Sequence, residues 1–135
     1  MTPEQIELVQ RAWGRVTALN NTYVQEVYTE LFRLSPDLIN LFPDPAGMPV
    51  TKVSETLNTV ITSLEQLDAL GFIIRDLGRR HRQFNVQSHQ FGLLKQALTL
   101  VLARRLGEHF TPALSDAWSQ MYDEIAALML EGLSQ

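Results

Sequence analysis

Apolar residues recur every three or four positions along most of this chain, and that period restricts its secondary structure more than any other feature. Such spacing gathers apolar side chains on one face of an α-helix, whereas a half-buried strand would alternate them at every second position. The clearest stripes consist of Ile6, Val9, Trp13 and Val16 near the start, and of Leu114, Trp118, Met121, Ile125 and Leu128 near the end. Segment 56–62 is rich in β-branched residues, yet its apolar period is also helical. The sequence therefore predicts an all-α fold of six to seven helices.

Short motifs mark where several helices begin and end. Thr2-Pro3 and Thr111-Pro112 each place a hydroxyl at a helix N-cap and a proline at the first helical position. Ser35-Pro36 should open a short helical turn ending at residue 42, and Gly107 should end a helix that runs from about residue 88 to 106. Residues 43–49 contain three prolines and one glycine. We expect them to form a short loop inside a single domain that spans residues 1–135.

Gly14, Gly78 and Gly92 stand alone inside otherwise helical patterns. Glycine in a helix interior costs up to ~1 kcal/mol relative to alanine, so an isolated one needs a reason. Close packing of two helices is the reason that we expect at all three positions.

The composition excludes several classes of function. The chain has no cysteine, which rules out disulfides, thiol catalysis and thiolate-bound metals. Its net charge of −4 argues against nucleic acid as a partner, since no basic stripe could neutralise phosphates. No apolar run approaches the length of a membrane span, and Glu4 and Glu7 lie where a signal peptide would be apolar. We expect a cytoplasmic protein without a membrane partner, either a monomer or a homodimer.

His81 is the first candidate for a metal ligand among the three histidines of the chain. Ile73, Ile74, Leu77 and His81 fall at helical spacing, so the sequence places the imidazole on an apolar face. A neutral imidazole there could offer one nitrogen to iron while the other donates to a carbonyl. The alternative is a helix-end histidine whose polar atoms are satisfied by backbone alone. The sequence around His81 alone leaves both interpretations open, an iron ligand and a helix-end histidine.

The joint spacing of Tyr28, Pro36, Phe42, His81 and Trp118 resembles that of the globin family over essentially the whole chain. Phe91, Ala117 and Tyr122, with the short connection after Phe42, are similar to bacterial single-domain haemoglobins and the globin domain of flavohaemoglobins. The resemblance implies a globin fold with a short Pro-rich loop between the C and E helices. It also implies haem b, iron protoporphyrin IX, with His81 as the metal ligand.

The resemblance further assigns roles around the haem. Tyr28 would hydrogen-bond the gas ligand, and Phe42 would stack on the porphyrin. Lys52 and Arg80 would approach the propionates. Taken singly, each apolar candidate is more often plain core than pocket wall. These candidates are Val53 and Leu57 on the distal side, and Leu77, Val86, Phe91 and Leu94 on the proximal side.

Two departures from the family pattern affect the expected function. Counting back from His81 by the bacterial spacing puts Pro49, flanked by Met48 and Val50, where many globins carry a distal Gln or His; the myoglobin spacing would select Lys52 instead. Phe91 replaces a tyrosine of flavohaemoglobins, which weakens a peroxidase-like interpretation. We expect reversible binding of O2 or another diatomic gas (CO, NO) for oxygen storage, delivery or scavenging. The alternatives are a nitric oxide dioxygenase or peroxidase-like enzyme with an external reductase, or a gas-sensing module.

Overall fold

The computed structural model describes residues 1–18, 22–42 and 50–134. Over these ranges the chain is helical and contains no strand, which confirms the all-α prediction. The predicted proline-rich loop, including Met48 and Pro49, lies outside the described residues. The α-helices are α1 (Pro3–Ala18), α2 (Tyr23–Leu34), α3 (Val50–Thr62), α4 (Leu67–Arg80), α5 (Ser88–Leu106) and α6 (Pro112–Leu133). Short 3-10 segments are η1 (Pro36–Leu41), η3 (Leu64–Gln66), η4 (His81–Phe84) and η5 (Gly107–His109).

The helix ends follow the predicted capping motifs. The Thr2 amide donates to Gln5 Oε1 at 2.9 Å, and the Gln5 amide donates back to Thr2 Oγ1 at 3.1 Å. At the start of α6, Thr111 Oγ1 accepts from the Leu114 amide at 3.2 Å. Gly107 ends α5 with φ at +56°, a left-handed value that side chains with a Cβ rarely adopt. These ends are therefore fixed by local chemistry.

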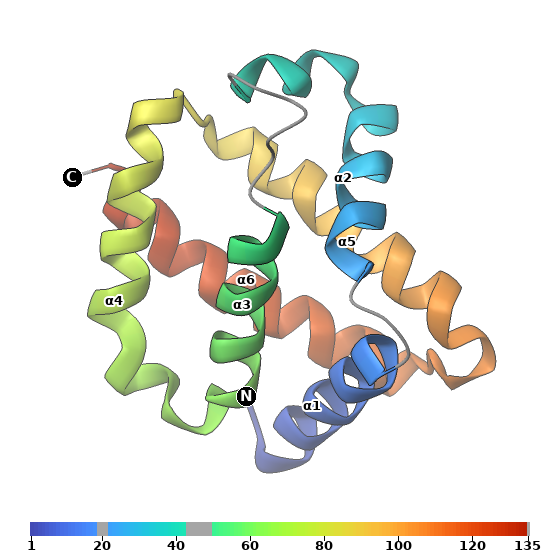
Figure 1. The fold of residues 1–135 in the computed structure, drawn as a ribbon. Coiled ribbons are helices and arrows are strands. Elements are labelled where there is room, and N and C mark those ends of the chain that lie inside the picture. Colours follow the sequence, from blue (N-terminus) through green and yellow to red (C-terminus); the bar gives the residue numbers. More distant parts are fainter. Residues whose placement is uncertain (19–21, 43–49, 135) are drawn as a thin grey trace.

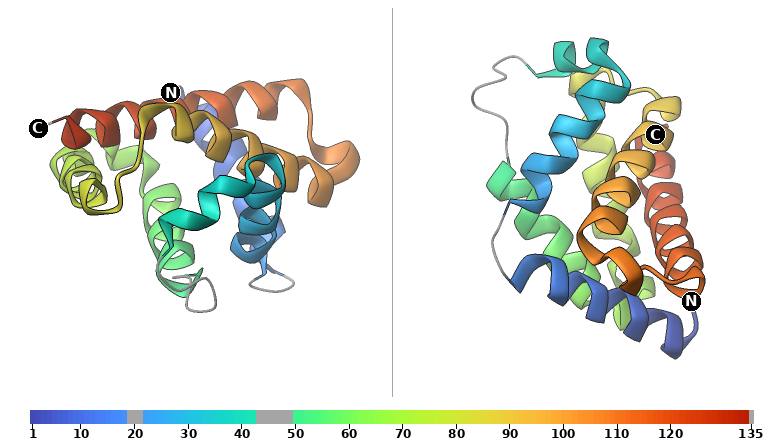
Figure 2. Two further views of the ribbon diagram at one scale, coloured as in Figure 1. Left: turned by 90° about the horizontal axis from the view of Figure 1, so that it is seen from above. Right: turned by 90° about the vertical axis from the view of Figure 1, so that its right-hand side faces the viewer.

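The helices pack in crossing pairs (Figures 1 and 2), and α6 is the longest of them. Helices α1 and α4 both pack on α6, while α2 packs on α5. Helix α3 packs on α1 and α2, and it forms no extensive contact with α4 although η3 connects the two. The largest side chains that are fully buried, which mark the centre of the core, are Trp118, Tyr23, Ile61, Leu102, Val9 and Val101. No helix in the described ranges is long and apolar enough to cross a membrane.

Helices α4 and α6 approach each other backbone to backbone. A Cβ placed on Gly78 would overlap the carbonyl of Met129, and a Cβ placed on Gly132 would overlap the carbonyl of Arg75. The two glycines therefore allow a crossing that no other residue would permit. Gly14 and Gly92 have open space where a Cβ would lie. The packing prediction is thus confirmed at Gly78 and wrong at the other two positions, where the sequence pattern could not show which helix face meets a neighbour.

A buried carboxylate fastens α2 to α5. Glu30 is only 6% exposed, and it pairs with Arg33 at 2.6 Å and with Arg104 of α5. Hydrogen bonds from Arg104 and then from Arg33 hold the pKa of Glu30 below its usual value. Close by, Arg105 Nη2 donates to Glu26 Oε1 at 2.7 Å. Charged contacts therefore fix the helix that carries Tyr28.

Replacing Gly78 with alanine should destabilise the fold, because the new methyl group must push α4 away from α6. We expect a loss of ~1–3 kcal/mol in the free energy of unfolding, the range typical of overpacked sites. Gly92→Ala is the matched control, since it adds the same methyl group to a helix in open space. That variant should be neutral or stabilised by up to ~1 kcal/mol. Urea unfolding followed by circular dichroism measures both, and equal stability of the two variants would contradict the close crossing.

Candidate functional site

His81 stands where α4 ends and η4 begins, and only one of its ring nitrogens is engaged. Its Nδ1 lies 2.6 Å from the carbonyl oxygen of Leu77. A carbonyl can only accept a hydrogen bond, so in the neutral ring Nδ1 carries the proton and Nε2 keeps a free lone pair. No hydrogen bond to Nε2 occurs within the described ranges. Backbone therefore satisfies one side of the half-buried ring and leaves a ligating atom on the other.

The face of α4 that carries His81 differs from the predicted one at a single position. Ile74 is 2% exposed and Leu77 is half-buried, as expected for the inner side of the helix. Ile73, however, is 51% exposed and lies on the outer side, so its placement beside His81 was wrong. Ile73 precedes His81 by eight residues. At about 100° per residue, two full turns and a remainder of roughly 80° separate the two side chains around the helix axis. A neighbour that the sequence analysis missed is Phe84, whose ring meets the imidazole edge-on at 6.2 Å.

Tyr28 and Phe42, two of the candidate haem-site residues, lie in contact. The Tyr28 ring meets the Phe42 ring edge-on, with centroids 5.4 Å apart. Phe32 completes a three-ring cluster, stacked on Tyr28 at 6.1 Å and edge-on to Phe42 at 5.6 Å. The sequence could have predicted the contact of Phe32 with Tyr28, because residues four positions apart are neighbours on a helix. The cluster holds the end of η1 against α2.

The Tyr28 hydroxyl makes no hydrogen bond to any residue that the structure describes, although its side chain is buried. Burial raises the pKa of this phenol above its ordinary value, so it remains a proton donor at neutral pH. The hydroxyl of Tyr23, by contrast, donates to the carbonyl of Leu98 at 2.7 Å. Two fully buried polar atoms lack partners in the described part of the chain, namely Ser54 Oγ and Trp118 Nε1; the Tyr28 hydroxyl is not among these fully buried atoms. The sequence analysis gave neither of these a polar role.

The apolar candidates come from three helices and the segment before α5. Val53 and Leu57 of α3 and Leu94 of α5 are only half-buried, and all three pack against the main core. Three further candidates lie outside that core: Leu77 and Val86 are half-buried, and Phe91 is buried, with its carbonyl accepting from the Tyr122 hydroxyl at 2.5 Å. Helices α3 and α4 form no extensive contact, and half-buried apolar side chains remain on both helices.

The two cationic candidates are both exposed. Lys52 is exposed on α3. The Arg80 side chain is 70% exposed and pairs with Asp76 at 2.9 Å on its own helix. Arg79 pairs with the same carboxylate. Both cations are therefore exposed to solvent, and Arg80 has a carboxylate partner on its own helix.

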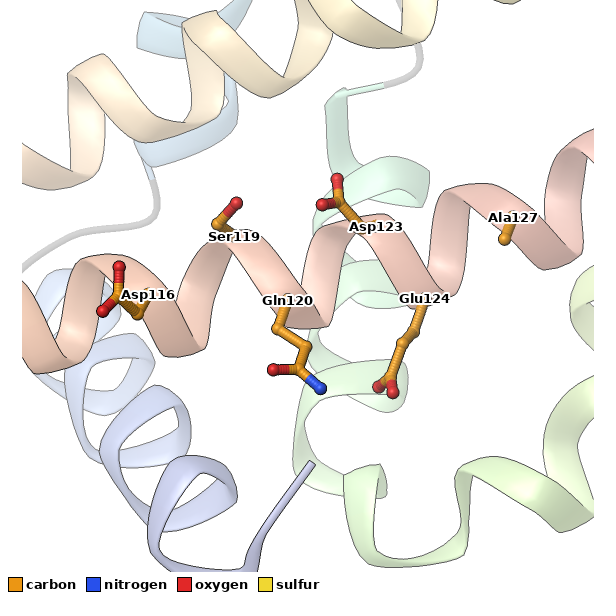
Figure 3. Close-up of a pocket in the computed structure, with 6 residues that line it drawn as sticks. All are labelled: Asp116, Ser119, Gln120, Asp123, Glu124 and Ala127. Carbon is orange, nitrogen blue, oxygen red and sulfur yellow. The ribbon is translucent and has the colours of Figure 1, made fainter.

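A separate hollow lies on α6 and is lined by Asp116, Ser119, Gln120, Asp123, Glu124 and Ala127 (Figure 3). All six residues come from that one helix, and none was a site candidate. Two of its carboxylates are already engaged, since Glu124 lies 3.5 Å from the N-terminal amine of Met1 and Asp123 lies 2.9 Å from Lys95 Nζ. No group of three or more His, Cys, Asp or Glu side chains that could hold a metal ion occurs among the described residues.

Comparison with known proteins identifies the family. A family model described as Globin matches residues 25–129, and the chain belongs to the globin family. A neuroglobin from Tetraodon nigroviridis is 28% identical over 93% of this chain and 88% of its own length. A neuroglobin from Danio rerio is 30% identical over 93% of this chain and 87% of its own length. Neuroglobin-1 from Oncorhynchus mykiss is 27% identical over 98% of this chain and 92% of its own length.

The family prediction is confirmed, but the predicted branch is not. These relatives are vertebrate neuroglobins rather than bacterial haemoglobins or flavohaemoglobins. The bacterial assignment relied in part on the short connection after Phe42, which lies outside the described residues, and on aromatic residues that pack in the core. Side chains that only pack in a core distinguish the branches of a fold family poorly, because many different sequences can pack the same core equally well.

Membership of the globin family implies haem as the prosthetic group, and the residues present fit it. His81 offers an unprotonated nitrogen, as iron ligation requires. Half-buried apolar side chains on α3, α4 and α5 could cover a flat apolar molecule. The Tyr28 hydroxyl, which has no hydrogen-bond partner among the described residues, could offer a polar group to a small ligand.

Tyr28→Phe should leave the stability of the chain without haem nearly unchanged, because the lost hydroxyl makes no hydrogen bond within the described residues. Tyr23→Phe is the matched control, since it removes a buried hydroxyl that donates to Leu98. That variant should lose ~1 kcal/mol or more of unfolding free energy. Urea denaturation of the two proteins provides the comparison. A larger loss for Tyr28→Phe than for Tyr23→Phe would show that the Tyr28 hydroxyl has a structural partner.

Proposed function

We propose that this globin holds haem b through Nε2 of His81 and reversibly binds O2 or another diatomic gas. The hydrogen bond from Nδ1–H to the Leu77 carbonyl is the observation that supports this proposal most strongly. It selects the tautomer in which Nε2 is a free electron-pair donor, and it sets the direction of the ring. His81 would hold the haem iron, and the iron would supply the atom that binds the gas.

Apolar side chains would enclose the haem on both faces. On the His81 side we assign Leu77, Val86, Phe91 and Leu94 to the wall. On the opposite side we assign Val53 and Leu57, which lie one helical turn apart on α3. A dry environment of this kind protects a haem from water and strengthens polar contacts inside it. Phe42 would press its ring on the haem, with its position fixed by the edges of Tyr28 and Phe32.

Tyr28 would donate a hydrogen bond to the gas. Its hydroxyl has no partner among the described residues, and burial raises its pKa, so the proton is available. A hydrogen bond of this type contributes ~1 kcal/mol, rising to about 3 when the acceptor carries charge. A polar ligand such as O2 would therefore gain more from Tyr28 than a less polar one such as CO.

Lys52 and Arg80 would form ion pairs with the haem propionates on the solvent side. Arg80 would have to exchange its contact with Asp76 for a propionate, and both cations are exposed. Exposed ion pairs contribute only ~0–1 kcal/mol, so these residues would aid haem retention modestly.

His81→Ala tests the assignment of the iron ligand. The variant should fail to retain haem, or lose it rapidly to an acceptor globin, because no other ligating side chain would remain on that face. Adding free imidazole should restore a haem absorption spectrum, since the small molecule can occupy the vacated place. His89→Ala, which alters an exposed histidine on α5, is the control and should bind haem normally. Wild-type absorption and haem retention in His81→Ala would overturn the assignment.

Tyr28→Phe tests the hydrogen bond to the gas in the haem-loaded protein. Losing a bond of ~1–3 kcal/mol should raise the O2 dissociation rate by about fivefold to more than a hundredfold. The CO dissociation rate should change far less. Stopped-flow release of both gases from both proteins decides the question. Equal, small changes for the two gases would exclude Tyr28 as the donor and point to Lys52 or to a trapped water.

A further inference from the structure

Phe84 is a large aromatic residue next to His81 that the proposed haem site does not use. Both residues belong to η4, the 3-10 segment that follows α4 where the chain turns towards α5 (Figure 1). Their ring centroids lie 6.2 Å apart and the ring planes are 73° apart, which is an edge-on contact. Phe84 is 41% exposed, so packing of the core does not account for its place. Its ring is the only aromatic ring in contact with the imidazole among the described residues.

The 3-10 geometry of η4 explains why the two rings meet. A 3-10 helix has about three residues per turn, so side chains three positions apart lie in line along its axis. In an α-helix the same spacing would leave them about 60° apart. Helical side chains also lean towards the N-terminal end of their helix. Phe84 therefore points back over the turn that carries His81.

Hydrogen bonds fix the turn that follows Phe84. Asn85 has φ at +57°, in the left-handed region, which asparagine adopts more readily than most residues. Its amide donates to the carbonyl of Arg82 at 3.0 Å. Its carbonyl in turn accepts from Nε2 of Gln87, the N-cap residue of α5, at 3.1 Å. The backbone therefore holds Phe84 in place although its side chain is partly exposed.

The imidazole of His81 is contacted from the turn before it and from the turn after it. On the earlier side, Nδ1 donates to the carbonyl of Leu77. The torsion about the Cβ–Cγ bond of histidine has broad energy wells, so neighbouring groups decide the rotation of the ring. A hydrogen bond at one atom still lets the ring swing about the line that joins donor and acceptor. The ring of Phe84 adds a second contact, which restricts this motion.

We propose that Phe84 is a positioning residue for His81. Its ring fixes the rotation of the imidazole, preserves the hydrogen bond to Leu77, and so keeps Nε2 unprotonated and pointing in one direction. The inference rests on the proposed function, in which Nε2 binds the haem iron. Groups that orient a metal-binding histidine tune how well it holds the metal. Phe84 acts through the imidazole and needs no contact of its own with haem or gas.

Nitrogen-15 NMR of the haem-free chain, at a pH where the imidazole is neutral, tests the positioning directly. In the wild type, His81 should populate mainly the tautomer with the proton on Nδ1. Phe84→Leu removes the ring but keeps an apolar side chain, and the ratio of this tautomer to the other should fall by about two- to tenfold. Phe84→Tyr keeps a ring and should restore the wild-type ratio. Phe72→Leu, which removes a more exposed phenylalanine from α4, is the matched control and should change nothing.

The haem-loaded chains provide a second measurement. Haem loss to an acceptor globin should be about two- to tenfold faster in Phe84→Leu than in the wild type, and Phe84→Tyr should reverse this change. A wild-type tautomer ratio in Phe84→Leu would overturn the proposal, and so would an equal change in Phe72→Leu. Faster haem loss with an unchanged ratio would also overturn it, because Phe84 would then contact the haem itself. The NMR measurement needs no haem, so this proposal and the test of His81 as the iron ligand can fail separately.

Discussion

The close crossing of α4 and α6 is the contact on which the other features of this molecule depend. Gly78 and Gly132 let the two backbones meet, and this contact fixes both the depth and the rotation of α4. Once the rotation is set, Leu77 and His81 turn to the inner side of the helix while Phe72 and Ile73 turn outward. A single backbone contact therefore positions the proposed iron ligand and also leaves an apolar face exposed.

The second anchored part of the structure is α2. Ion pairs of Glu26 and Glu30 with arginines of α5 hold this helix, and the aromatic cluster at its end holds Phe42. Tyr28 thus lies on a helix held by ion pairs, with its ring against Phe32 and Phe42, while its hydroxyl makes no hydrogen bond to a described residue. A polar atom held rigidly without a partner is suited to binding a ligand, because no internal hydrogen bond has to break first.

Much of the fold could be predicted from the sequence, because helix periodicity and caps are local properties. The ends at Thr2, Gly107 and Thr111 depend on neighbouring residues alone, and each was predicted correctly. Tyr28 and Phe42 were both chosen as haem-site candidates by their spacing in a known family, and the structure brings their rings into contact. The family itself was also predicted correctly, although the expected bacterial branch was not.

Other features depend on contacts between distant segments and could not be predicted from local pattern. Gly78 and Gly92 look alike in sequence, yet only Gly78 meets another helix, because that depends on where α6 lies. The position of Ile73 is a different case, because helix geometry alone puts it roughly 80° away from His81. Arg80 has a carboxylate four residues earlier on its own helix, and this nearby partner competes with the propionate contact that the family resemblance suggested.

The most direct test of the central claim, that α4 presents His81 to a haem, is an absorption titration of the wild-type chain with haem. We expect the Soret band to grow until one haem is bound per chain and then to stop. After reduction, added CO should shift that band, because an axial position is open to a gas. A titration that never saturates, or a reduced spectrum that CO leaves unchanged, would contradict the account.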